Sequence, residues 1–269
     1  MDLGIAGRAC VVTGASRGIG RESARLLCEA GASVLLVAKE AGELEAAQQE
    51  CASAATAGAQ ASSLALDLRS AEAPEQVWAE AVERLGSVDI LVNNAGTASA
   101  RDLAEVPDSD WYGAFELNVM TPKRLMDASI PAMVERGWGR VVNVSSTSGK
   151  RPSASMPEYS VAKAAQLSLS RLYADRYASA GVLVNAVCPG PTKSGMWMDP
   201  GGLLDQAREL GGHASNEEAL RSAGAKRPIG RLAEVSEIAP AIAFLCSERA
   251  SYVAGAAWSV DGGTVPVII

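Results

Sequence analysis

Short apolar runs alternate with longer stretches of helical character along the chain. Each run has about five or six residues and is apolar on both faces, which is typical of strands buried inside a parallel sheet. The predicted strands are 9–13, 33–38, 62–67, 89–93, 140–145, 182–187 and 256–260. Helices are expected at about 18–30, through the forties and fifties, from about 74, over 108–136, around 157–179 and from about 235. This alternation predicts an α/β fold, a doubly wound parallel sheet of about seven strands with helices on both faces.

One stretch, Pro189 to Ala233, lacks strand character and is rich in glycine and polar residues. Because so long a connection is usually a lid or a binding segment, we expect a single domain over 1–269 with a substrate lid at about 192–226. A short amphipathic helix that covers an apolar pocket is predicted from the spacing of Leu203, Leu204, Ala207 and Leu210. Two roles stay open for the segment Met196-Trp197-Met198, which either lines the pocket or packs the lid onto the body.

Composition limits the partners and the chemistry. With 48% hydrophobic but only 4% aromatic residues, the core must consist mainly of Ala, Val, Leu and Ile. A net charge of −7 argues against nucleic acid and against anionic membranes, and no apolar run reaches the roughly 18–20 residues of a membrane span. We therefore expect a cytoplasmic protein whose five scattered cysteines are buried free thiols. His213 is the only histidine, so no metal site is expected.

A glycine-rich turn follows the first strand and opens the first helix. Its glycines permit a tight turn and close approach of the backbone to a pyrophosphate, and the helix N-terminus offers free N–H donors. The alternative is a turn that merely closes a loop, but the strand–turn–helix setting favours dinucleotide binding. The candidate residues are Gly14, Ser16, Arg17, Gly18, Ile19 and Gly20.

The end of the second strand bears on the choice of nicotinamide. An acidic residue there would hold the ribose 2′-hydroxyl and repel a 2′-phosphate, but this chain has Ala38 followed by Lys39. Together with Arg17, the lysine favours NADP(H) by charge complementarity. Glu40 is the argument for the alternative, NAD(H).

Tyr159 and Lys163 are four residues apart, so on a helix they share one face. An ammonium close to a phenol should lower the tyrosine pKa from about 10 towards working pH, as a general acid/base needs. Ser146 lies thirteen residues before Tyr159, at the end of the fifth strand, and Asn118 lies in the preceding long helix. Strand alternation should turn Ser145 away from Ser146.

The spacing of the glycine turn, T-G-x-x-x-G-x-G, and the segment Asn93-Asn94-Ala95-Gly96 resemble the short-chain dehydrogenase/reductase family, and more closely its 3-oxoacyl carrier-protein reductase-like branch. The resemblance runs from Gly14 to Gly263 and implies a Rossmann-type fold and a homotetramer. It also implies a catalytic tetrad, in which Ser146 polarises the substrate carbonyl and Tyr159 transfers the proton. Lys163 would bind the nicotinamide ribose and tune Tyr159, and Asn118 would hold a relay water.

The resemblance adds further cofactor positions. Asp67 would bond the adenine ring, and Pro189, Gly190 and Thr192 would flank the nicotinamide carboxamide. The further cofactor-binding positions are Leu68, Asn94, Ala95, Gly96, Tyr159 and Lys163. The expected function is an NADP(H)-dependent oxidoreductase acting on a small carbonyl or secondary alcohol, first of all a 3-oxoacyl thioester, free or carrier-bound, or a related ketone. The alternatives are an NAD(H)-dependent alcohol or sugar dehydrogenase and a catalytically silent NADP(H)-binding regulator. The complete tetrad favours an enzyme, whereas the long segment after the sixth strand departs from the compact reductases.

Overall fold

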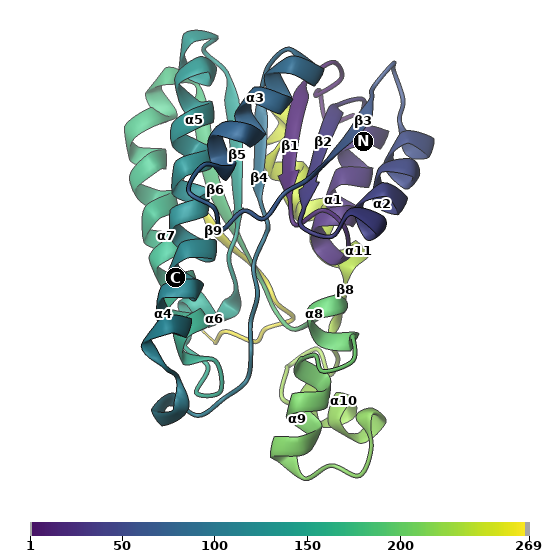
Figure 1. Cartoon of the computed structure of the whole chain (residues 1–269), viewed down its shortest axis with the longest axis vertical. Helices are drawn as coiled ribbons and strands as arrows, with labels where there is room; N and C mark the ends of the chain where they lie inside the picture. The colour runs from purple at the N-terminus through teal and green to yellow at the C-terminus, as the bar shows by residue number, and fades with distance from the viewer. Residues whose placement is uncertain (1, 267–269) are drawn as a thin grey trace.

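A seven-stranded parallel sheet forms the centre of the molecule (Figure 1). The structure is a computed structural model and describes residues 2–266. In spatial order the strands are β3 (Ala61–Ala65), β2 (Ser33–Ala38), β1 (Ala9–Thr13), β4 (Ile90–Asn93), β5 (Gly139–Val144), β6 (Val182–Pro189) and β9 (Ala257–Val260). The strand order reverses between β1 and β4. In a doubly wound sheet, ligands bind at the carboxyl edge beside such a reversal.

Helices cover both faces of the sheet (Figure 1). One face carries α1 (Gly18–Glu29), α2 (Ala41–Ala54) and α11 (Val235–Leu245), and the other carries α3 (Ala73–Leu85), α5 (Thr121–Glu135) and α7 (Pro157–Tyr177). The shorter helices are α4 (Asp108–Phe115), α6 (Thr147–Lys150), a π-helical turn (Glu116–Met120) and 3-10 turns at Leu103–Glu105, Ala178–Ala180 and Glu248–Ala250. The predicted fold class is confirmed. Among the described residues, no helix has the length and apolarity needed to cross a bilayer.

Alternation along the strands divides the core into two clusters. In β2, Val34 and Leu36 pack towards α1 and α2, whereas Leu35 and Val37 pack towards α3 and α5. This follows from the two-residue period of a strand buried on both faces. The largest fully buried side chains in the described part of the chain are Ile, Leu and Met rather than aromatic residues. All five cysteines are buried and free, as predicted.

Two predicted elements differ from the structure. The helix expected over 108–136 is divided by the π-helical turn, because the Asn118 side chain donates to the Ala114 carbonyl four residues earlier and so perturbs the regular ladder. The third strand, expected over 62–67, ends at Ala65. Beyond it the chain turns, since the Asp67 carboxylate accepts from the Arg69 backbone N–H at 3.1 Å.

The lid segment is more structured than the sequence pattern indicated. It contains α8 (Gly195–Met198), α9 (Leu203–Gly211) and α10 (Asn216–Ala225), which project from the carboxyl edge of the sheet at the bottom of Figure 1. The stretch expected to lack strands begins and ends with a short parallel pair, β7 (Thr192–Lys193) and β8 (Ala233–Glu234), which joins the two ends of the lid.

The expected helix α9 is present, but its apolar face is shorter than predicted. Leu203 and Leu204 are buried near its start, whereas Leu210 is 70% exposed in its last turn. The apolar contact is therefore confined to the first turn, and Leu210 was wrongly placed on the covering face.

Candidate active site

A cleft of about 1010 Å³ opens at the carboxyl edge of the sheet. This volume lies at the upper end of the roughly 300–1,000 Å³ range of small-molecule sites. The cleft is lined by most of the residues singled out in the sequence: Gly14, Ser16, Arg17, Gly18, Ile19, Ala38, Lys39, Asp67, Leu68, Asn94, Ala95, Gly96, Ser146, Tyr159, Lys163, Pro189, Gly190 and Thr192. Gly20 and Asn118 are not among the lining residues, and each lies against a residue that is.

The glycine turn is tightly fitted against the end of β4. Gly14 has a positive φ of 63°, and a Cβ placed there would lie 2.8 Å from the Cα of Ala95. The Asn94 side chain donates to the carbonyl oxygens of Thr13 and Gly14, both at 3.0 Å, and the Thr13 hydroxyl accepts from the backbone N–H of Asn94 at 3.0 Å. The Asn94 side chain, predicted only as a cofactor contact, therefore also fixes the turn.

The start of α1 fits a phosphate group. Arg17 occupies the N-cap position, and its side chain makes no capping hydrogen bond. The free N–H groups at a helix N-terminus and the positive end of the helix dipole favour an anion. With the close-packed glycines beside it, this turn has the donors and the space that a dinucleotide pyrophosphate requires.

The two cations predicted to favour NADP(H), Lys39 and Arg17, differ in their ion pairing. Lys39 forms no ion pair with another described residue, and Ala38 before it is 8% exposed. Arg17 is ion-paired with Asp199 of the lid, and its Nη1 atom lies 4.0 Å from the Glu43 carboxylate. The sequence did not predict these two acidic partners of Arg17.

Asp67, predicted to lie at the adenine, is paired with a neighbouring arginine. Its Oδ2 lies 2.5 Å from the Arg69 Nη2, and this hydrogen bond, with help from Lys39, lowers the pKa of Asp67 to about 2. The carboxylate is therefore charged and already bound on one side where it borders the cleft.

The chemical end of the cleft is built by β5 and α7. Ser146 follows β5, and Tyr159 and Lys163 lie one turn apart in the first half of α7. The Lys163 Nζ lies 5.7 Å from the Tyr159 ring centroid and donates to the Val144 carbonyl at 2.7 Å and to Gln166 Oε1 at 3.1 Å. Gln166 was missed, although its spacing of three residues places it on the same helix face as Lys163.

Burial is the main cause of the pKa shifts of Tyr159 and Lys163. It raises the pKa of Tyr159 to about 12, although a hydrogen bond with Ser146 opposes the rise. Burial also lowers the pKa of Lys163 to about 7. The expectation that Lys163 lowers the pKa of Tyr159 is therefore wrong for the cofactor-free protein. The Lys163 ammonium donates to Val144 and Gln166, and desolvation has the larger effect on the tyrosine pKa.

Ser145 and Ser146 both line the cleft, but their hydroxyl groups have different hydrogen-bond partners. The Ser145 hydroxyl donates to the Lys163 backbone carbonyl at 3.0 Å and is buried. The Ser146 hydroxyl accepts from the Ser148 backbone N–H at 3.0 Å and belongs to the residue that caps α6 at the cleft. The Ser145 hydroxyl is therefore bonded to the α7 backbone, whereas the Ser146 hydroxyl is hydrogen-bonded with the Tyr159 side chain.

Asn118 presents an unsatisfied oxygen to the interior. Its Nδ2 donates to the Ala114 carbonyl at 2.9 Å, but its buried Oδ1 has no hydrogen-bond partner among the described residues. A Cβ placed on Gly96 would lie 3.0 Å from this oxygen and 3.7 Å from the Lys163 Nζ. Glycine therefore keeps open a small polar space between Asn118 and Lys163, of the kind that an ordered water occupies.

The cleft is also lined by polar residues that no sequence motif indicated. Arg101 and Asp110 form an ion pair there, and Glu158 is a buried carboxyl residue whose Oε2 lacks a hydrogen-bond partner among the described residues. Gln206 of the lid accepts from the Ala100 backbone N–H at 2.6 Å. Met196 and Trp197 line the cleft, whereas Met198 is not among the lining residues and is 43% exposed.

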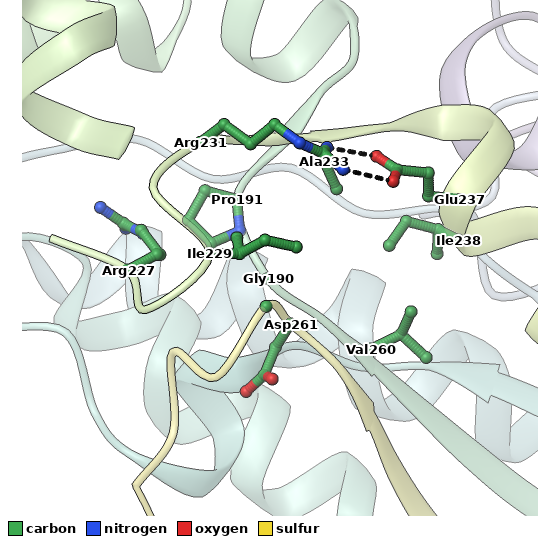
Figure 2. A pocket seen from close by; sticks show the side chains of 11 residues that line it. Gly190, Pro191, Arg227, Ile229, Arg231, Ala233, Glu237, Ile238, Val260 and Asp261 are labelled. Atoms are coloured by element: carbon green, nitrogen blue, oxygen red, sulfur yellow. Dashed lines mark hydrogen bonds and ion pairs between the residues drawn. The ribbon is translucent and has the colours of Figure 1, made fainter. Parts of the chain in front are cut away.

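A second cavity of about 210 Å³ borders the cleft at Gly190, which lines both (Figure 2). Its walls include Pro191, Ile229 and Val260, and its charged edge is the Arg231–Glu237 pair, joined at 2.6 Å. None of the tetrad residues reaches it. This cavity lies beside the β7–β8 pair at the base of the lid and is separate from the candidate active site.

The depressed pKa of Lys163 predicts how its loss affects stability. In the unfolded chain the lysine keeps its proton up to about pH 10.5, but in the folded protein it loses that proton near pH 7. Wild-type stability should therefore rise with pH between these values. We expect Lys163→Met to raise the melting temperature of the cofactor-free protein most below pH 7, with a gain that shrinks as the pH rises. Lys123→Met, on the exposed side of α5, is the control. If the melting-temperature difference between Lys163→Met and the wild type does not change between pH 6 and pH 9, the lowered pKa of Lys163 is contradicted.

Comparisons with known proteins agree with this geometry. Residues 8–201 match the family described as short chain dehydrogenase. The chain is 33% identical to the 3-oxoacyl-acyl-carrier-protein reductase of Vibrio cholerae, over 97% of this chain and 98% of that protein. It is 35% identical to the cis-4-hydroxycyclohexanecarboxylate dehydrogenase of Sinomonas cyclohexanicum, over 99% of this chain and 100% of that protein.

Among solved structures, the fold is similar to that of L-sorbose reductase from Gluconobacter frateurii in complex with NADPH and L-sorbose. The TM-score is 0.91 at 33% identity, and the match covers all of both chains. Since the family match spans most of the chain and the relatives match at full length, the chain belongs to the short chain dehydrogenase family.

Proposed function

We propose that this protein is an NADP(H)-dependent reductase that interconverts a ketone and a secondary alcohol. The observation that carries the proposal is the placement of Ser146, Tyr159 and Lys163 at one end of a single cleft whose other end is an uncapped helix N-terminus. One end suits proton transfer to a carbonyl oxygen, and the other suits a dinucleotide phosphate.

The cofactor is NADP(H). The turn Gly14–Gly20 and the start of α1 would hold the pyrophosphate, and Lys39 and Arg17 would meet the 2′-phosphate. Support comes from the absence of an acidic residue at Ala38 and from the NADPH in the L-sorbose reductase structure. When bound, the nicotinamide supplies the hydride in reduction and receives it in oxidation.

The protein's own part is to orient the substrate and move a proton. The Ser146 hydroxyl would donate to the substrate carbonyl oxygen, and the Tyr159 hydroxyl would transfer its proton to the same oxygen. Because the pKa of Tyr159 is about 12, the phenol is protonated at neutral pH and ready to act as an acid in the reduction direction. Lys163 and a water beside Asn118 would return the proton to Tyr159 through the polar space that Gly96 leaves open.

For the substrate, a 3-oxoacyl thioester or a related small ketone is the first candidate, supported by the full-length match to the 3-oxoacyl-acyl-carrier-protein reductase. A polyhydroxy ketone is the second candidate. It is favoured by the polar lining of the cleft, where the Arg101–Asp110 pair and the buried Glu158 carboxyl offer hydrogen-bond partners to hydroxyl groups. The similarity to L-sorbose reductase also supports it.

A substrate screen tests the function. Purified protein should oxidise NADPH in the presence of acetoacetyl thioester, a β-keto ester, a cyclic ketone or L-sorbose, with kcat/KM at least ten-fold higher for the preferred class. Replacing NADPH by NADH should lower kcat/KM. Tight NADPH binding without turnover of any ketone or reverse oxidation of any alcohol would instead support the silent regulator, and equal use of both cofactors would refute the NADP(H) preference.

A further inference from the structure

Arg17 connects the cofactor end of the cleft to the lid. Its guanidinium belongs to the N-cap residue of α1, and its ion-pair partner Asp199 follows α8 in the lid. Glu43 in the first turn of α2 is a second, more distant carboxylate at 4.0 Å, and it also accepts from the Ser16 hydroxyl at 3.4 Å. All four residues line the cleft. Two acidic side chains thus converge on one of the two cations expected to meet the 2′-phosphate.

Close packing holds Asp199 in this place. A Cβ on Gly195 would lie 2.7 Å from Asp199 Oδ2 and 2.9 Å from Arg17 Cδ, so both side chains of the pair pack closely against this glycine. On the other side, a Cβ on Gly18 would lie 3.2 Å from the Ser194 Cβ. The base of the lid therefore rests directly on the glycine turn, with Asp199 beside the guanidinium.

A carboxylate and a phosphate bind a guanidinium group in the same way. Both bind its planar fork of N–H donors through two oxygens, so they compete when only one position is available. A 2′-phosphate arriving beside Asp199 and Glu43 would also be repelled by their charges until Arg17 turns away from them. NAD(H) carries a hydroxyl at this position and raises no such competition.

We propose that Asp199 is a specificity-determining residue, a lid carboxylate that competes with the 2′-phosphate of NADP(H) for Arg17. The inference rests on the proposed use of NADP(H). Lys39, which has no ion pair with another described residue, gives the phosphate a second cation that Asp199 does not occupy, so the phosphate displaces the carboxylate. Binding of NADP(H), but not of NAD(H), therefore releases the base of the lid from the glycine turn.

Two small probes isolate the 2′-phosphate from the rest of the cofactor: adenosine 2′,5′-bisphosphate and adenosine 5′-monophosphate. Titration calorimetry should show that Asp199→Asn binds the bisphosphate about two- to five-fold tighter than the wild type, the scale of one exposed ion pair. The affinity for the monophosphate should stay the same. Glu43→Gln should give a smaller gain, because Glu43 is the more distant partner.

Two further variants separate a specific contact from general charge. Glu217→Gln removes a carboxylate from the first turn of α10, elsewhere on the lid, and should change neither affinity. In Arg17→Gln the bisphosphate should bind more weakly, and adding Asp199→Asn to that background should give no further gain. A gain that persists without Arg17, or one equal for both probes, would overturn the competition.

The two proposals fail in different ways. If the wild type binds both probes equally but Asp199→Asn prefers the bisphosphate, the competition stands and the NADP(H) preference of the natural protein falls. If the wild type prefers the bisphosphate and Asp199→Asn leaves that ratio unchanged, the cofactor assignment stands and the role of Asp199 is refuted. If neither protein distinguishes the probes, both proposals fail.

Discussion

Replacing Tyr159 by phenylalanine should lower kcat by about 10²- to 10⁴-fold, the usual contribution of a positioned proton donor. The substitution removes only the hydroxyl, and the ring stays in its buried place between Ser146 and Lys163. Binding of NADPH should change little, because the pyrophosphate and 2′-phosphate contacts lie at the other end of the cleft. Steady-state kinetics with the preferred ketone and fluorescence titration of NADPH measure the two effects.

The same helix offers a matched control. Tyr173 lies further along α7, outside the cleft, where its hydroxyl bonds to Asp127. Tyr173→Phe should therefore retain full kcat. A Tyr159→Phe enzyme as active as the Tyr173→Phe enzyme would remove Tyr159 from the reaction and shift the proton to a bound water.

Replacing Gly20 by alanine should have the largest effect on the cofactor. The added Cβ would lie 2.3 Å from the Gly14 carbonyl oxygen and 2.4 Å from the Asn94 Nδ2, distances that no side chain tolerates. Because the first contact is backbone, α1 must move away from the turn. We expect a loss of about 3 kcal/mol in the free energy of unfolding and roughly 10- to 100-fold weaker NADPH binding, since the N–H donors move with the helix.

Gly42 is the control for this substitution. A Cβ there meets nothing within 4 Å, and the residue lies in the first turn of α2. Gly42→Ala should leave NADPH affinity unchanged and gain about 0.5–1 kcal/mol of stability from the better helix propensity of alanine. Chemical denaturation and NADPH titration of both variants check the pair. Equal behaviour of the two alanine variants would show that the glycine turn is not closed as described.

The mobile lid of the sequence-based hypothesis now has defined anchors. Asp199 holds Arg17 on one side of the cleft, and Gln206 holds the Ala100 backbone on the other. Both anchors are partly exposed polar contacts, which are weak enough to break on binding. We therefore propose that the lid moves by losing these two contacts and turning about the β7–β8 pair at its base.

The sequence by itself determined the seven strands of the sheet, most of the long helices that cover it and the position of the glycine turn after the first strand. A period of two or of 3.6 residues depends on neighbours along the chain, and so do the glycine turn and the spacing of Tyr159 from Lys163. These features could be predicted because their physical causes are local.

Only the tertiary structure decided the contacts between residues that are distant in the sequence and the burial of the titrating groups. The pairing of Arg17 with Asp199 joins residues 182 positions apart. The raised pKa of Tyr159 and the lowered pKa of Lys163 come from burial by several elements at once, and burial reversed the shift that an isolated tyrosine–lysine pair would produce. Desolvation and long-range charge pairing depend on three-dimensional packing, which a one-dimensional pattern does not encode.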